Sequence, residues 1–236
     1  MWSNARSSAE LEAQLPVPIE IRPMRRAKRM RLRFDEAGGI LKLTCPWRTS
    51  RSAALKWAVE QRAWVETQIA RAEPAIAFAP GAVIPIDGVE RTIAWDERAP
   101  RTPALRGTAL HCGGPERGLA RRIEGFLKAR ALTVMSDDAA EFAALAGVSV
   151  ASVAVGDAAS RWGSCSSQGR IRLSWRLVCA PPAVRRYVVA HEVAHLRHLD
   201  HGPKFKALER ELAGPGLTGA KAWLRREGPR LRRLGR

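Results

Sequence analysis

The chain has 236 residues, of which 46% are hydrophobic, and its 40 lysines and arginines against 23 aspartates and glutamates give a formal net charge of +17. This hydrophobic content can bury a sizeable core, so the composition excludes a wholly disordered chain and allows one large domain or two small ones. No stretch approaches the roughly 18 uninterrupted apolar residues of a membrane span, and the first residues lack the apolar run of a signal peptide. We therefore expect no membrane partner and a cytoplasmic location.

The N-terminal part has the pattern of β-structure. Residues 1–16 are polar and predict a flexible lead. Apolar and polar residues then alternate in three short segments, which is typical of strands with one buried face. These predicted strands cover residues 19–22, 30–34 and 41–45.

Residues 50–74 predict a single helix. Ser50 or Ser52 can provide its N-cap, apolar residues from Leu55 to Ile69 recur at the helical period, and Pro74 ends it. Residues 81–95 then predict a hairpin that turns at Asp87-Gly88.

Residues 96–116 hold prolines, glycines and charges without clear periodicity, so we expect a long irregular connection there. A boundary near residue 115 would separate a β-rich part with one helix, residues 17–115, from a second domain, residues 116–224. Residues 225–236 predict a basic tail.

The second domain is predicted to begin with helices over residues 116–134 and on to Ala146, where Gly147 stops the helical pattern. Alternating valines from Val148 to Val155 then predict a strand. Residues 160–177 contain a Ser/Gly turn between two extended segments, which predicts a hairpin. Two further helices are expected over residues 205–212 and 220–224.

The four cysteines include no Cys-x-x-Cys pair and are too few for a disulfide framework, so buried, reduced thiols are favoured over a second metal site. They are Cys45, Cys112, Cys165 and Cys179. Cys165 and Cys179 could lie near each other across the predicted hairpin, so the state of that pair stays open.

A cluster of histidines carries the clearest chemistry: four of the five histidines fall within eleven residues. His191 and His195 are four residues apart, so on one helix both can direct a ring nitrogen at a single ion. Ala180-Pro181-Pro182 marks the start of that helix. Glu192, offset by one residue, cannot join the ligand face, but it can take a proton from a water that the ion holds.

His201 is the better candidate for a third ligand. His198 lies on the ligand face, but one further turn of a straight helix carries it about 5 Å too far. If the helix ends near His198 and the chain doubles back at Gly202-Pro203, His201 returns toward the ion. Three protein ligands leave one coordination position open, which is typical of a catalytic zinc site rather than a structural one.

The chain resembles the YgjP-like metallopeptidase domain family, which is related to the SprT-like and WLM zinc proteins of the zincin group. The resemblance is dense over residues 160–208, and its first box is Arg161-Trp162-Gly163-Ser164-Cys165. The remaining matching segments are 171–177, 180–182, 187–196, His201 and Phe205. It implies an α+β zincin-like fold, one zinc ion on His191, His195 and His201, and a catalytic Glu192.

Two departures from the family pattern lie beside the third ligand. An Asn-His-Ser segment is usual where this chain has Asp200-His201-Gly202, and an aromatic pair is common where it has Phe205-Lys206. Neither removes a ligand, although an acid beside His201 can alter metal affinity.

Arg161 and Tyr187 are candidate catalytic donors. Tyr187 lies one turn before His191, and Arg161 lies in the box that the family places beside the metal. Each also has a plain structural interpretation, Tyr187 as a core residue and Arg161 in an ion pair.

Three functions remain open from the sequence. The first is a zinc-dependent peptidase acting on a protein or peptide. The second is a zinc-dependent phosphoanhydride hydrolase, because a chain this basic favours anionic small molecules such as nucleotides. The third is a nucleic-acid-binding protein with a structural zinc, for which basic clusters at residues 22–33 and 221–236 are the motive. Glu192 favours hydrolysis, since a structural site needs no base beside its ligands.

Overall fold

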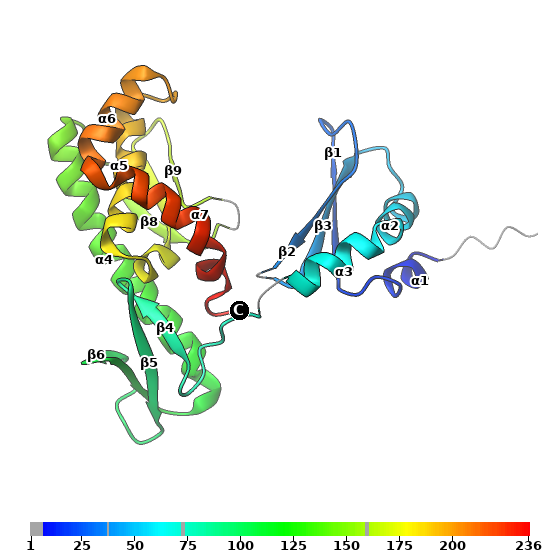
Figure 1. Cartoon of the computed structure of the whole chain (residues 1–236), viewed down its shortest axis with the longest axis horizontal. Helices are drawn as coiled ribbons and strands as arrows, with labels where there is room; N and C mark the ends of the chain where they lie inside the picture. Colours follow the sequence, from blue (N-terminus) through cyan, green and yellow to red (C-terminus); the bar gives the residue numbers. More distant parts are fainter. Residues whose placement is uncertain (1–6, 37, 72–73, 159–160) are drawn as a thin grey trace, which may run out of the picture. The chain divides into compact units, whose positions relative to one another are not determined.

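The computed structural model describes residues 7–36, 38–71, 74–158 and 161–236. The chain divides into two compact units between Ala75 and Ile76, shown in Figure 1. The sequence pattern places a boundary near residue 115 instead. The boundary differs because residues 76–113 contribute buried side chains to the same core as the helices that follow them. Part of this segment has no clear periodicity, so the sequence pattern did not reveal that shared core.

The N-terminal unit contains a three-stranded sheet in the order β1-β3-β2. Its strands are β1 (Ile19–Met24), β2 (Arg31–Asp35) and β3 (Ile40–Pro46). β1 is parallel to β3, whereas β2 is antiparallel to it. The three strands predicted from alternation are therefore confirmed.

Helices pack on one face of this sheet. They are α1 (Ser8–Glu12), α2 (Arg51–Glu60) and α3 (Arg62–Arg71). Ser50 caps α2 as predicted, but the expected single helix is broken at Gln61, which separates α2 from α3. The expectation of a flexible lead is wrong for residues 7–16, because Ser7 and Glu10 form a capping box and Leu11 and Leu15 are buried in the core. The rest of that prediction, residues 1–6, lies outside the described residues.

The second unit begins with a four-stranded sheet in the order β4-β5-β7-β6. Its strands are β4 (Val83–Ile86), β5 (Val89–Asp96), β6 (Ala104–Arg106) and β7 (Ala109–Gly113). The turn at Asp87-Gly88 is confirmed, with both residues at positive φ. The irregular connection expected over residues 96–116 is wrong, because this segment contains β6 and β7, and β7 pairs in parallel with β5. Strands of three and five residues are too short to show a clear periodic pattern.

A second sheet lies beside the helices, in the order β8-β10-β9. Its strands are β8 (Ser152–Gly156), β9 (Gly163–Cys165) and β10 (Arg170–Ser174). β9 and β10 form the predicted hairpin, and β8 is parallel to β10. All four cysteines are free thiols, so Cys165 and Cys179 form no disulfide, and Cys165 pairs in register with Ile171.

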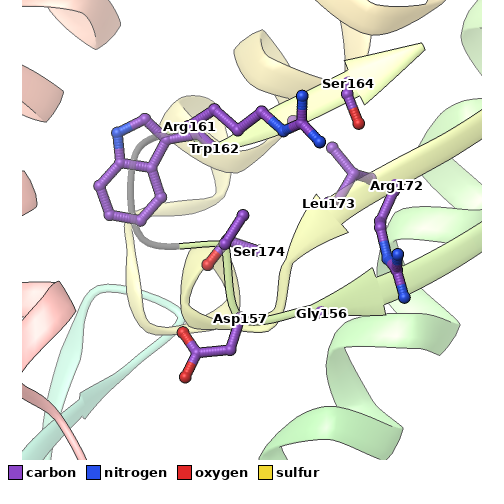
Figure 2. Close-up of a pocket in the computed structure, with 10 residues that line it drawn as sticks. Gly156, Asp157, Arg161, Trp162, Ser164, Arg172, Leu173 and Ser174 are labelled. Carbon is purple, nitrogen blue, oxygen red and sulfur yellow. The ribbon is translucent and has the colours of Figure 1, made fainter. Parts of the chain in front are cut away.

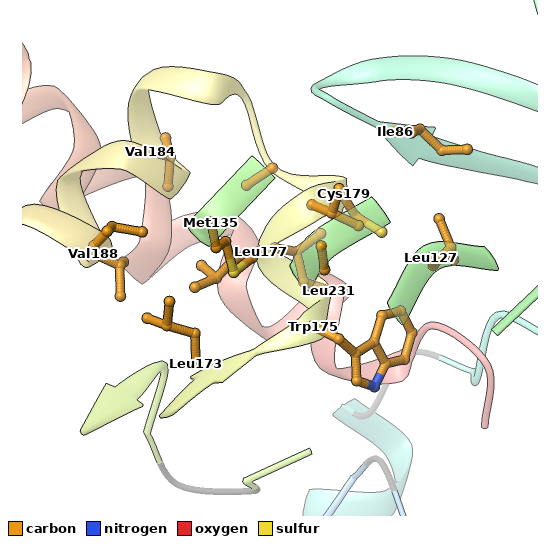
Figure 3. Packing of buried hydrophobic residues seen from close by; sticks show 14 of the residues in the cluster. Ile86, Leu127, Met135, Leu173, Trp175, Leu177, Cys179, Val184, Val188 and Leu231 are labelled. Atoms are coloured by element: carbon orange, nitrogen blue, oxygen red, sulfur yellow. The ribbon is translucent and has the colours of Figure 1, made fainter. Parts of the chain in front are cut away.

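Four long helices complete the unit: α4 (Leu119–Ala146), α5 (Pro182–Arg197), α6 (Pro203–Ala213) and α7 (Leu217–Arg233). Short 3-10 turns lie at Glu116–Gly118, Trp175–Cys179 and Gly214–Gly216. α4 is one continuous helix, and Gly147 ends it in the left-handed conformation as predicted. Figure 3 shows Trp175, Leu177 and Leu231 among the side chains that these helices bury together.

The predicted basic tail is wrong, because residues 225–233 belong to α7. Leu231 and Arg233 are buried, and the guanidinium of Arg232 lies 4.2 Å from the centroid of the Trp162 ring. Apolar residues interspersed among the arginines therefore pack this segment against the core. The segment is amphipathic, but its many charged residues concealed that pattern in the sequence. None of the helices in the described ranges combines the length and the apolar character needed to cross a bilayer.

This docking can be tested by truncating one side chain. Leu231 is 1% exposed, so Leu231→Ala should lower the free energy of unfolding by about 2–5 kcal/mol through lost burial and a cavity. Leu145→Ala, at a position 66% exposed, is the matched control and should change it by less than about 0.5 kcal/mol. Equal values from urea denaturation of the two variants would mean that residues 225–233 do behave as a tail.

Candidate metal centre

Helix α5 positions two of the three predicted ligands. It begins at Pro182, a position at which the backbone N–H that proline lacks would have no partner within the helix. The helix buries an apolar stripe that includes Val184 and Val188. His191 and His195 follow on this helix, one turn apart, and their ring centroids are 4.9 Å apart. The predicted helix is therefore confirmed, with both imidazoles on one of its faces.

The chain turns back directly after α5 and returns His201 to the other two histidines. His198 leaves the helix in an extended conformation, and the Asp200 carboxylate accepts a hydrogen bond of 2.8 Å from the backbone N–H of Gly202. The His201 ring centroid lies 5.3 Å from that of His191 and 4.6 Å from that of His195. Asp200 thus stabilises the turn that brings His201 back.

The three imidazoles fit a metal ion. One nitrogen from each lies within 4.8 Å of the others, and the Nε2 atoms of His191 and His201 are 3.5 Å apart. Two nitrogens that share a tetrahedral zinc ion at about 2.0–2.1 Å are separated by roughly 3.4 Å. The donor set is all imidazole, which suits zinc and also accepts iron, nickel or copper.

Outer hydrogen bonds orient the rings on α5. Nδ1 of His191 lies 2.7 Å from Oε1 of Glu209, and Nδ1 of His195 lies 3.1 Å from the carbonyl oxygen of His198. Both Nδ1 atoms are therefore engaged, and the Nε2 atoms are left to face a common point. Burial lowers the pKa of His195, which favours the neutral imidazole that metal binding requires.

Glu209 is a residue of this site that the sequence patterns did not single out. It is 4% exposed and accepts hydrogen bonds from Lys221 Nζ at 3.0 Å and from the Tyr187 hydroxyl at 3.3 Å. Burial alone would raise the pKa of Glu209, but the hydrogen bonds from His191 and Lys221 hold it below its ordinary value. The signal was available: Glu209 falls on the buried stripe of α6, where a carboxylate needs a partner.

Phe205 supplies an apolar wall for the cluster. Its ring centroid lies 5.1, 4.5 and 4.7 Å from the centroids of His191, His195 and His201. The side chain is 1% exposed. This wall limits the access of water to one side of the three rings.

Glu192 is buried against the β9–β10 hairpin. Its side chain is enclosed so closely that a Cβ atom added at Gly163 would lie 2.7 Å from its Cγ. Burial raises the pKa of Glu192 to about 7, while the positive charge of Arg161 acts in the opposite direction. A carboxyl group with this pKa can accept and release a proton near neutral pH.

A pocket of about 230 Å³ opens over this carboxyl group. It is lined by Arg161, Trp162, Gly163, Tyr187, Val188, His191, Glu192 and Leu224. A larger pocket of about 280 Å³, drawn in Figure 2, shares Arg161, Trp162 and Gly163 with it and also contains Arg172. The Arg-Trp-Gly box therefore contributes to both.

The structure separates the two candidate donors. Tyr187 is half-buried, its hydroxyl donates to Glu209, and burial together with the charge of Glu209 raises the pKa of its phenol. Arg161 is exposed and lines both pockets. Burial and the charge of Glu192 raise the pKa of the Cys165 thiol to about 11, which disfavours the reactive thiolate.

Comparison with known proteins gives one informative result. A family model described as "YgjP-like, metallopeptidase domain" matches residues 28–227. Searches of curated proteins and of solved structures find no match. The family match covers most of the chain and includes the histidine cluster, Glu192 and the Arg-Trp-Gly box, so this protein belongs to the YgjP-like metallopeptidase family.

Proposed function

We propose that the protein is a zinc-dependent peptidase in which His191, His195 and His201 hold one ion and Glu192 is the general base. Membership of the family supports a metal-dependent peptidase. The observation that carries the finer assignment is the convergence of three imidazole nitrogens beside a buried carboxyl group that opens into a pocket. A site built only for stability has no use for that carboxyl group or that opening.

A bound zinc ion would supply a Lewis acid that polarises the peptide carbonyl and lowers the pKa of the attacking water. Glu192 takes the proton from that water and delivers it to the amine that leaves. Its burial matters because a carboxylate in a dry site is a stronger base than one in bulk water.

The residues that line the pocket support specific roles in this proposal. Trp162, Val188 and Leu224 offer an apolar surface for a substrate side chain. Arg161 is the better candidate to stabilise the oxyanion, because the Tyr187 hydroxyl already donates to Glu209. Tyr187 then acts through Glu209, by helping to hold the carboxylate that orients His191.

Phosphoanhydride hydrolysis is the second candidate function. It is favoured by the larger pocket, which is lined by two arginines, Arg161 and Arg172 (Figure 2), and which shares Arg161 with the pocket over Glu192. Guanidinium groups bind phosphate oxygens in a bidentate manner. The two candidate functions share the same metal ligands. They differ in the substrate group next to the arginines, which is a peptide carbonyl in the first and a phosphate in the second.

Glu192→Gln tests the proposed base. We expect turnover to fall by about 10²-fold or more while the zinc content stays near one ion per chain, because the amide cannot accept the proton. The assay is a panel of unfolded proteins and nucleoside triphosphates, scored for peptide fragments and for pyrophosphate.

Glu211→Gln on the exposed side of α6 is the matched control and should keep full activity. Fragments without pyrophosphate support the peptidase, and pyrophosphate without fragments supports the second candidate. Full activity of Glu192→Gln would remove the proposed base from the mechanism.

The buried carboxyl group also predicts a pH dependence of stability in metal-free protein. The pKa of Glu192 is about 7 in the folded state against an ordinary 4.5, so between these values the folded protein holds a proton that the unfolded chain has released. The free energy of unfolding therefore falls as pH rises from 4.5 to 7, by about 3 kcal/mol in total. Glu192→Gln should lack this term.

Urea denaturation of chelator-treated protein measures the effect. Wild type and Glu192→Gln should be nearly equal at pH 4.5, and the variant should be more stable by about 3 kcal/mol at pH 8. A constant difference across this range would contradict burial of an ionisable Glu192.

Gly163→Ala tests the contact between β9 and the base. The added methyl group would displace the Glu192 side chain, so we expect kcat to fall by about tenfold or more with zinc still bound. Gly125→Ala on α4, where nothing lies within 4 Å, is the control and should leave kcat unchanged. Unchanged kcat in Gly163→Ala, with a crystal structure showing Glu192 in place, would contradict this role.

A further inference from the structure

The sheet of the N-terminal unit has one buried face and one bare face. Leu41 and Leu43 of β3 are buried under α2 and α3, together with Leu55 and Val65 from those helices. Side chains alternate along a strand, so the intervening residues of all three strands point the other way. Within this unit, the helices of the described residues lie on the buried side only (Figure 1).

The bare face is strongly basic. The register places Arg22 and Arg31 on either side of Thr44, and Arg33 beside Lys42. The turn between β1 and β2 adds four more exposed cationic side chains. We call this set the basic face; its members are Arg22, Arg25, Arg26, Lys28, Arg29, Arg31, Arg33 and Lys42.

Few carboxylates neutralise this surface. Glu20 pairs with Arg22 at 3.5 Å, and Asp35 pairs with Lys42. Among the described residues, no carboxylate forms an ion pair with the four basic residues of the turn at 25–29. So many like charges repel one another, and an anionic partner would relieve that repulsion.

An exposed tryptophan lies at the end of the same sheet. Trp47 follows β3 directly and is 54% exposed. The guanidinium carbons of Arg25 and Arg48 lie 5.8 and 5.1 Å from its ring centroid. An indole that remains so exposed contributes little to the core, but it offers a planar ring with two cations beside it.

We propose that the basic face and Trp47 form a binding surface for single-stranded nucleic acid. A base stacks on the Trp47 ring, and the arginines of the basic face bind the flanking phosphates. A duplex presents phosphates but keeps its bases stacked on one another, and an acidic protein segment presents charge without repeated planar rings. Charge together with an exposed aromatic therefore favours a single strand. This inference is independent of the proposed peptidase function.

Fluorescence anisotropy of the full chain with a labelled mixed-sequence 20-nucleotide strand tests the proposal. Trp47→Ala should weaken binding by about tenfold, and the double variant Arg31→Ala/Arg33→Ala should reduce the salt slope of log K by about 1.4. The matched controls lie on the helical side: Trp64→Ala, at a residue 41% exposed, and Lys56→Ala/Arg62→Ala. Both controls should bind as wild type does.

Thermal unfolding of each variant checks that the N-terminal unit remains folded, and Trp47→Phe should restore most of the lost affinity because a ring is retained. The proposal is overturned if no binding is seen, if the controls lose as much affinity as the test variants, or if a duplex binds as tightly as the single strand. Displacement by polyglutamate at equal charge concentration would also overturn it, in favour of an acidic protein partner.

Discussion

The hydrogen bond between His191 and Glu209 ties together the elements that make the site. It joins α5, which carries two of the ligand candidates, to α6, which follows His201 directly. Glu209 is buried, so its charge requires partners, and His191 and Lys221 supply them. Because Lys221 belongs to α7, one carboxylate sets the relative position of three helices and, with them, of the third imidazole.

A second constraint acts on the other side of the site. Glu192 can be buried only because β9 approaches α5 at Gly163, where no side chain occupies the space. The same burial brings the pKa of this carboxyl group to about 7, at a cost in stability for the metal-free protein. The proposed chemistry and this local loss of stability therefore have a single origin, the enclosure of a carboxyl group by backbone.

The two compact units differ in the chemistry of their surfaces. The larger one encloses a histidine cluster and two pockets, whereas the smaller one presents a cationic sheet face with an exposed tryptophan. Each has its own hydrophobic core. The positive charges of the two units therefore have different surroundings. Arg232 of α7 packs on Trp162 and Arg233 is buried, whereas the arginines of the basic face remain exposed.

The sequence by itself determined the features that depend on local spacing. His191 and His195 share a helix face, Glu192 lies beside them, Gly147 ends α4, and the strands of the N-terminal sheet follow from alternation, because helical and extended periods place side chains without help from distant residues. Only the tertiary structure decided the rest. Contacts between segments far apart in the chain determine three features: the role of Glu209 beside His191, the parallel pairing of β5 with β7, and the docking of α7. No local sequence pattern records the energies of such contacts. The return of His201 depends on both the sequence and the tertiary structure. Gly202-Pro203 predicted a turn, but the packing of α6 sets the direction in which the chain returns.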